Sequence, residues 1–223
     1  MTTKPNAKPI SRSESLPQLV AALGGSLMVA LLYLIMPREL IVGPNWLALA
    51  AVIILAVPAL SLLLFSESGI EHRLIRPFTL TILSLLTLAL ITSLALLIHE
   101  LVVITPGAGL DLLKPAVLLW ASNVVIFAIW YWEVDGGGFI GRHHRRHEAA
   151  DFRFPQQDGG NTTHWVPGYI DYLFLAFSTA TAFSPADTVP LTRRAKLLMM
   201  GESIGSMVIL VMLIARSINI ISK

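Results

Sequence analysis

The sequence predicts an all-α integral membrane protein with five transmembrane helices and a re-entrant helix and loop between the fourth and the fifth. Of the 223 residues, 55% are hydrophobic and only 13% are charged, whereas globular domains carry about 25% charged residues. The mean hydropathy is +0.71. Five apolar runs approach the ~20 residues that a helix needs to cross a bilayer. A sixth run, Tyr169 to Phe183, is shorter.

The chain begins with a polar tail. Residues 1–15 are polar and interrupted by proline, which predicts a disordered segment. The apolar run after it is too long for the apolar region of a cleaved signal peptide. Residues 16–110 are predicted to form a peripheral bundle of three transmembrane helices. No cysteine is present, which excludes disulfides and thiol chemistry.

Three apolar runs make up this bundle. The first, Leu16 to Met36, contains Gly24-Gly25-Ser26, which allows close helix packing. The second runs from about Trp46 to Phe65. The third starts at Pro77, after a polar link at residues 71–76, and reaches about Ile98. We expect its hydroxyl residues to bond backbone carbonyls or neighbouring helices. These residues are Thr79, Thr81, Ser84, Thr87, Thr92 and Ser93.

Two further spans and a loop follow. The fourth span starts near Pro115 and ends in Trp130-Tyr131-Trp132, an aromatic cluster typical of a membrane interface. The loop at residues 134–168 is too short for a domain with its own core. Its Gly136-Gly137-Gly138 sequence predicts a helix terminator, and a joint that couples the loop to the helices is the alternative. The fifth span runs from about Ala195 to Ile221.

The short apolar run predicts a re-entrant segment at residues 169–187. It has about 15 residues and ends in Ser184-Pro185, whereas a spanning helix needs ~20. Proline restricts the residue before it and stops a helix. Non-helical backbone at membrane depth persists only where it is buried in protein or lines a wet cavity. The segment is therefore a candidate permeation or binding element.

The C-terminal part resembles the pore loop and inner helix of tetrameric potassium channels. The resemblance rests on Thr179-Ala-Thr-Ala-Phe-Ser-Pro-Ala-Asp187, on Val189-Pro-Leu-Thr192 and on Gly201-Glu-Ser-Ile-Gly205. It implies a pore-like domain over residues 111–223, with the fourth span as outer helix and residues 195–221 as inner helix. It also implies a homotetramer.

The filter of that family is not reproduced. If Asp187 matches the family's filter aspartate, the filter positions are Ala182, Phe183, Ser184, Pro185 and Ala186. Both filter glycines are absent, so the resemblance does not imply potassium selectivity. The stretches Tyr131–Gly138 and Ala182–Pro185 also resemble a bacterial integral-membrane family of unknown function, which implies the bacterial inner membrane.

Hydroxyl and carboxylate groups gather near the re-entrant tip. The hydroxyls of Ser178, Thr179, Thr181 and Ser184 can replace the hydration shell of a passing ion, or bond their own backbone. Asp187 at the mouth is a candidate member of a carboxylate ring that favours cations. The alternatives for Asp187 are a helix cap or a salt bridge to Arg193 or Arg194, and these basic residues leave anion permeation open.

Glu202 is an ionisable group inside the fifth span, which makes it a candidate functional residue. The structural alternative is a hydrogen bond from Glu202 to the back of the re-entrant helix. Gly201 and Gly205 surround it with the Gly-x-x-x-Gly spacing. This spacing favours a packing notch, with a hinge as the alternative.

The loop carries a histidine cluster. His143 and His147 are four residues apart, so they share one face if the stretch is helical, which makes them a weak metal-binding candidate. Protonation near neutral pH is a second interpretation. The favoured one is a solvated basic loop that touches anionic lipid. We expect no metal and no cofactor.

The basic residues predict the orientation. With a cytoplasmic N-terminus, twelve of the sixteen Lys and Arg residues lie on the inner side, and the four outside are Arg38, Lys114, Arg216 and Lys223. This bias follows the positive-inside rule and places the re-entrant segment on the cytoplasmic side. Potassium channels have the opposite arrangement, and ionotropic glutamate receptors have this one.

The expected function is an ion channel with a non-standard filter, working as a homotetramer in the bilayer and passing an inorganic ion. A small transporter or a non-conducting membrane scaffold protein is the alternative. The sequence shows no nucleophile and base pair, no phosphate-binding glycine loop and no nucleic-acid motif. We therefore expect neither an enzyme nor a nucleic-acid partner.

Overall fold

The computed structural model describes residues 24–25, 27–29, 31–38, 71–103, 113–146, 148–160, 165–184 and 187–221. The predicted tail at 1–15, most of the first span and the second span at 46–65 lie outside these residues. So do three candidate site residues, namely His147, Pro185 and Ala186.

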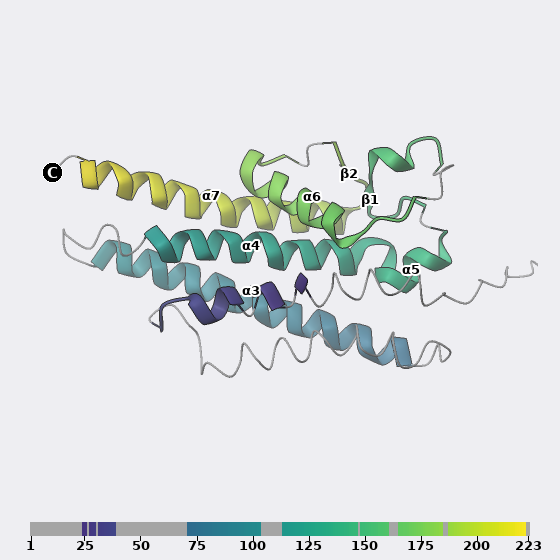
Figure 1. The fold of residues 1–223 in the computed structure, drawn as a ribbon, viewed down its shortest axis with the longest axis horizontal. Coiled ribbons are helices and arrows are strands. Elements are labelled where there is room, and N and C mark those ends of the chain that lie inside the picture. Colours follow the sequence, from purple (N-terminus) through teal and green to yellow (C-terminus); the bar gives the residue numbers. More distant parts are fainter. Residues whose placement is uncertain are drawn as a thin grey trace, which may run out of the picture.

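Long helices dominate the described structure. The helices α3 (Glu71–Val103), α4 (Leu113–Val134) and α7 (Arg193–Ile221) lie side by side along the long axis (Figure 1). The shorter α6 (Tyr169–Ala182) packs against α4 and α7. The third, fourth and fifth predicted spans are therefore each present as a helix.

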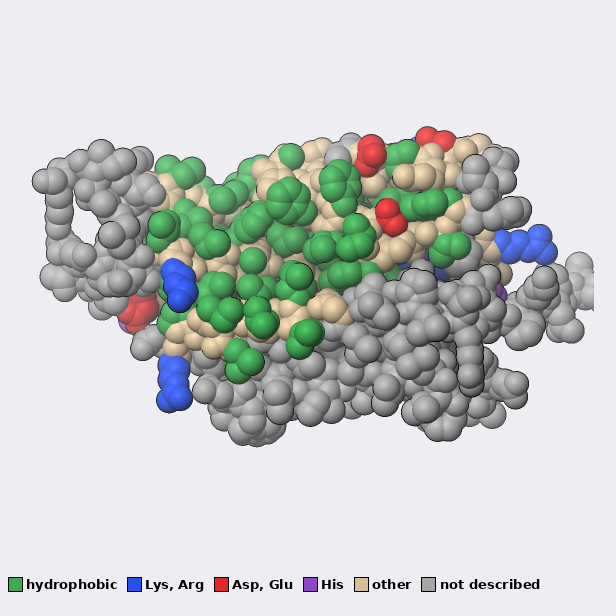
Figure 2. Space-filling model, in the orientation of Figure 1, with side chains coloured by type: hydrophobic (Ala, Val, Ile, Leu, Met, Phe, Trp, Pro, Cys, Tyr) green, Lys and Arg blue, Asp and Glu red, His purple; other side chains and the backbone are tan. Residues whose placement is uncertain are grey.

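Three of the described helical segments are long and apolar enough to cross a membrane. They are Thr79–Glu100, Leu113–His144 and Arg193–Ile214. Apolar side chains cover much of the face drawn in Figure 2, and charged side chains on it are few. The mostly helical fold class with apolar helices of spanning length, typical of a membrane protein, is confirmed to this extent.

The start of α3 corrects the sequence analysis. Residues 71–76, predicted as a polar link, belong to the helix, which continues through Pro77. Proline has no N–H, so α3 lacks the bond that residue 77 would otherwise donate to the Arg73 carbonyl. Tertiary contact supports this first part, because the Arg76 guanidinium lies 3.6 Å from where a Cβ on Gly137 would be.

The hydroxyl groups of α3 bond as predicted. Those of Thr81, Ser84 and Thr92 donate to the backbone carbonyl four residues earlier, at 2.8–2.9 Å. Thr87 does so too, and its Oγ1 also accepts a hydrogen bond from Trp130 Nε1 of α4 at 2.8 Å. This second bond joins α3 to α4, the helix around which the core forms.

The loop between α4 and α6 folds back onto the helices. After η2 (Asp135–Gly137) and α5 (Gly138–His144) come β1 (Phe152–Arg153) and η3 (Pro155–Gln157). The strand β1 pairs antiparallel with β2 (Val189–Pro190). The loop has no core of its own and uses the aromatic core of the helices instead.

Aromatic side chains attach this loop. Phe152 is fully buried, and its ring lies 5.1 Å from that of Tyr131 in α4. The Phe154 ring lies 5.3 Å from that of Tyr172 in α6. Edge-to-face aromatic pairs contribute about 0.5–1.5 kcal/mol beyond the area that they bury. The loop is thereby joined to α4 and α6.

Three consecutive glycines end α4. Gly136, Gly137 and Gly138 have φ values of 59°, 94° and 81°, a region that other residues enter only at a cost. The chain leaves the axis of α4 here and begins α5. The predicted helix terminator is confirmed, and the turn is built into the core, because Gly136 is buried.

Gly25 of the first span packs against the start of α6. A Cβ on Gly25 would lie 2.6 Å from Tyr169 Oη, whereas a Cβ on Gly24 would meet no described atom within 4 Å. The close packing predicted for this small-residue sequence is confirmed at Gly25.

Candidate functional site

The path of α6 is the feature that organises the site. Its first residue, Tyr169, lies against Trp132 near the C-terminal end of α4, with ring centroids 6.2 Å apart. Phe177 lies 5.8 Å from Trp120, further back along α4. At 1.5 Å per residue these tryptophans are about 18 Å apart. The helix α6 therefore runs antiparallel to α4 for more than half the length of that helix.

The chain then returns to the end from which α6 started. Leu191 N donates to the Asp151 carbonyl at 2.8 Å, and β2 pairs with β1. Entry and exit of this segment thus lie together at the C-terminal end of α4, where Figure 1 places α5, β1 and β2.

The tip of α6 carries the predicted filter residues. Ala182 and Ser184 are exposed, and Phe183 is 49% exposed with φ at 52°. Thr181 Oγ1 donates to the Phe177 carbonyl at 2.7 Å, and buried Thr179 donates to that of Leu175 at 2.8 Å. Both threonine hydroxyls therefore bond their own helix, as the structural alternative expected.

Asp187 is exposed, and its Oδ1 accepts a hydrogen bond from the Thr188 hydroxyl at 3.4 Å. The ion pairs among the described residues, Arg153–Asp158 and Arg194–Asp151, do not include it. The salt bridge to Arg193 or Arg194, one of the alternatives for Asp187, is therefore not formed in the described structure. Arg194 instead pairs with Asp151 of the loop, whose carboxylate is buried and shielded from water.

Glu202 lies at a second polar cluster, between α4 and α7. Its side chain is fully buried, and Oε2 accepts a hydrogen bond from the Tyr131 hydroxyl. Asn123 Nδ2 donates to the Glu202 carbonyl at 3.1 Å and to Ser206 Oγ at 2.9 Å. The predicted hydrogen bond from Glu202 to the back of the re-entrant helix is wrong, because the carboxylate bonds Tyr131 of α4 and not a residue of α6. Tyr131 connects Glu202 to α6 indirectly, since the Tyr131 hydroxyl also interacts with Thr179 of α6.

The two glycines beside Glu202 face α4. A Cβ on Gly201 would lie 3.7 Å from Phe127, and one on Gly205 would lie 3.2 Å from Asn123 Oδ1. This tight approach at Gly205 agrees with the packing interpretation. A side chain there would push against the buried amide that joins α4 to α7.

The histidine cluster does not have the geometry of the metal-pair hypothesis. The helix α5 ends at His144, and Arg146 has φ at 55°. The helical spacing that would place His143 and His147 on one face is therefore broken before His147 is reached. Among the described residues, no group of three or more His, Asp or Glu side chains is arranged to hold a metal ion.

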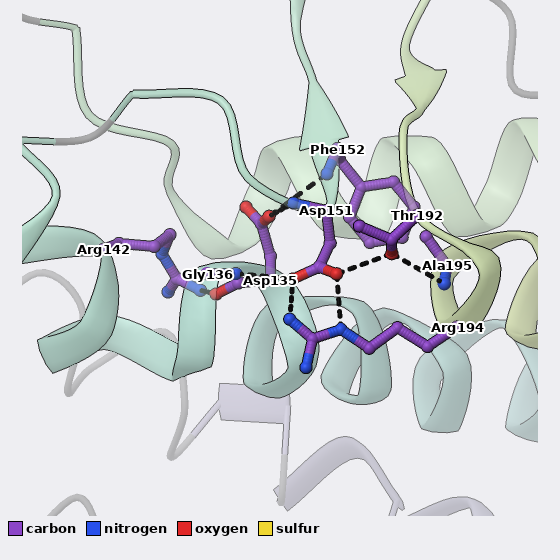
Figure 3. Close-up of polar contacts among 8 residues, drawn as sticks. All are labelled: Asp135, Gly136, Arg142, Asp151, Phe152, Thr192, Arg194 and Ala195. Carbon is purple, nitrogen blue, oxygen red and sulfur yellow. Dashed lines mark hydrogen bonds and ion pairs between the residues drawn. The ribbon is translucent and has the colours of Figure 1, made fainter.

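A network of two aspartates connects the loop to the end of α4 and to α7 (Figure 3), and a bond from Tyr172 extends it to α6. Asp135 Oδ1 accepts hydrogen bonds from the N–H groups of Asp151 and Phe152 at 2.9 and 3.2 Å, and its Oδ2 accepts one from the Tyr172 hydroxyl at 2.6 Å. The side chain is 2% exposed. This carboxylate therefore joins the end of α4 to the loop and to α6.

Asp151 is the second member of the network and is fully buried. Its Oδ1 accepts bonds from Thr192 at 2.6 Å and from Arg194 Nε at 2.5 Å, and its Oδ2 accepts from Arg194 Nη2 at 2.6 Å and from Gly136 N at 2.9 Å. Burial alone raises the pKa of Asp151, but the bonds from Arg194, Thr192 and Gly136 together hold that pKa below its ordinary value.

Arg142 closes the C-terminal end of α4. Its Nη1 donates to the carbonyls of Trp132 and Asp135, the latter at 3.0 Å. A positive charge at this end of a helix is favourable, because the unpaired carbonyls carry partial negative charge. The guanidinium also lies over the ring of Tyr172, 5.2 Å from its centroid. Arg142 thereby fixes α5 on α4 and α6.

The positions of Asp135, Asp151 and Arg194 in the sequence do not indicate that the three side chains meet. Asp135 and Asp151 are 16 residues apart and Arg194 lies a further 43 away. One signal was present, because Asp135 follows an aromatic belt and precedes three glycines. An acidic residue at the end of an apolar span needs a partner, but the partner is set by the fold of the loop.

Comparison with protein family models, with curated proteins and with solved structures finds no match for this chain.

Proposed function

We propose that this protein is a subunit of an ion channel in which α6 is a re-entrant pore helix. The observation that carries the proposal is the path of the chain, which enters along α4 at Tyr169 and returns to the same end at Leu191. Fourteen helical residues extend about 21 Å, less than the ~30 Å hydrocarbon core of a bilayer. A helix of this length ends inside the membrane.

The direction of α6 favours a cation. Its C-terminal end, at Ala182, is the end that lies away from the entry at Tyr169, and residues 182–184 there are exposed. The last carbonyls of a helix lack partners within the helix and carry partial negative charge. A half-helix that ends at membrane depth therefore places these carbonyls where a cation loses its water. The exposed Ser184 adds a hydroxyl at the same tip.

One chain supplies one such helix, so a central pore needs several copies related by rotation. The outer face of α6 supports assembly, because Ile170, Phe174 and Phe177 are 70%, 55% and 48% exposed at helical spacing. In the proposed homotetramer neighbouring copies cover part of this face and lipid covers the rest. The excess of Lys and Arg residues on the side of the N-terminus supports a cytoplasmic position for the re-entrant segment in the proposed channel.

A non-conducting scaffold or transporter remains the second candidate, and a specific observation favours it. The hydroxyls of Thr179 and Thr181 each donate to a carbonyl of their own helix, so both have a structural role that needs no ion. A purely structural re-entrant segment would use its hydroxyls in the same way.

Native mass in mild detergent, followed by ion flux in liposomes, tests the proposal. Four copies with potassium or sodium flux, and little chloride flux, support the channel. Ser184→Ala is expected to change flux or cation preference, whereas Ser84→Ala, an exposed serine on α3, leaves both unchanged. One or two copies without flux would remove the channel and favour the scaffold.

A further inference from the structure

Glu202 lies in the apolar part of α7, and none of the residues that the structure describes forms an ion pair with it. It is the only charged residue between Leu197 and Ile214. Residues 77–98 of α3 and 115–132 of α4 contain no charged residue either. Full burial in such surroundings strongly disfavours an ionised carboxylate.

The groups that face Glu202 from each packed helix are neutral. From α4 come Tyr131, which donates to Oε2, and Asn123, which donates to the Glu202 backbone carbonyl. The α6 group nearest to this pair is Thr179, which interacts with the Tyr131 hydroxyl. The nearest basic residue in sequence with a described ion pair, Arg194, binds Asp151. Tyr131 is thus the titratable group in contact with Glu202 in the described structure.

The two carboxyl oxygens are not equivalent. Oε2 has a donor in Tyr131, whereas Oε1 is buried with no hydrogen-bond partner in the described structure. An ionised carboxylate would leave negative charge on this unpartnered oxygen. A proton on Oε1 removes that charge and leaves Oε2 free to accept from Tyr131, so the neutral acid costs far less than the carboxylate.

We infer that Glu202 is a proton-binding site inside the membrane, with the proton on Oε1 and the Tyr131 hydroxyl bonded to Oε2. Ion conduction is not needed for this inference. The site connects three helices, since Tyr131 of α4 contacts both Glu202 of α7 and Thr179 of α6. Loss of the proton places a negative charge at this junction, so the charge of Glu202 and the packing of α6 on α4 are linked.

Infrared difference spectroscopy of the full protein in lipid at neutral pH tests this site. The wild-type protein is expected to show the carbonyl band of a protonated carboxylic acid, and Glu202→Gln is expected to lose it. Glu148→Gln, at an exposed glutamate of the loop, is the matched control and should retain the band. Other buried carboxyl groups cancel in these comparisons.

A second variant keeps the test decisive if Glu202→Gln does not fold. Tyr131→Phe removes the donor to Oε2 and should move the acid band to higher frequency without removing it. Loss of an ionised carboxylate band in Glu202→Gln would overturn the inference, as would an unchanged acid band in both variants.

Discussion

Arg194, in the first turn of α7, holds Asp151 of the loop through two parallel hydrogen bonds of 2.5 and 2.6 Å. This is the planar match of a guanidinium with a carboxylate, which a lysine cannot reproduce. The aspartate side chain is fully buried, and that of the arginine is 57% exposed. Because Asp151 is buried, its negative charge depends on Arg194 as a partner, and the pair is expected to contribute to stability.

Removal of Arg194 is expected to destabilise the protein. Arg194→Ala leaves the buried Asp151 carboxylate with bonds only from Thr192 and Gly136, a loss of about 1.5–3 kcal/mol for bonds to a charged group. Thermal unfolding in detergent measures it. Arg193→Ala, at the exposed neighbour, is the control. Equal effects of the two substitutions would show that the paired geometry contributes nothing.

Stability is expected to depend on Asp151 at acid pH. The folded protein holds the pKa of Asp151 below its ordinary value, which is about 3.9. Its contribution to the free energy of unfolding is therefore present above the unfolded pKa, and is lost as pH falls through the folded pKa. Unfolding followed below about pH 4 should show a weaker pH dependence in Asp151→Asn. A slope equal to that of the wild type would contradict this assignment.

Gly25→Ala is expected to disturb the packing of the first span on α6. Its Cβ would lie 2.6 Å from Tyr169 Oη, and overpacking costs about 1–3 kcal/mol. Gly24→Ala serves as the control, since it meets no described atom within 4 Å and gains helix propensity. Unfolding temperatures of both variants check the difference. A more stable Gly25→Ala protein would rule out this close contact.

Thr87→Val is expected to weaken the contact between α3 and α4. The substitution removes the acceptor of the 2.8 Å bond from Trp130 Nε1, and such interhelical bonds contribute about 0.6 kcal/mol on average in membranes. Thr92→Val removes a hydroxyl that bonds only its own helix in the described structure. The free energy of unfolding should fall more for Thr87→Val, and the reverse order would speak against the interhelical bond.

The helices could be predicted from the sequence, because apolar runs of spanning length have few alternatives in a bilayer. The end of α4 just before Gly136 and the end of α6 near Phe183 follow from glycine, serine and proline chemistry. The start of α3 was predicted wrongly, because a polar stretch followed by proline is typical of a link, whereas the helix runs through Pro77.

The candidate site was only partly predictable. Glu202 is visible in the sequence as a lone carboxylate in an apolar span, but its partner Tyr131 lies 71 residues away. The aspartate network was missed because β1 and β2, which bring Asp151 and Arg194 together, are two residues long each. Strands this short leave no periodic pattern. The pairing of β1 with β2 is supported by the burial of Phe152 in the core of the helices.

The described hydrogen bonds and the ion pair that join α7 to the rest of the bundle are unevenly distributed along this helix. Arg194, Glu202 and Ser206 bond the loop or α4, whereas Val211 and Ile214 further on are exposed and apolar. Apolar contacts slide past one another at small cost, but hydrogen-bonded carboxylates do not. The polar contacts of α7 with the loop and α4 therefore lie in its N-terminal half. We expect α7 to separate from α4 most readily at its C-terminal end. Deuterium uptake should accordingly rise along α7 from Arg194 towards Ile214.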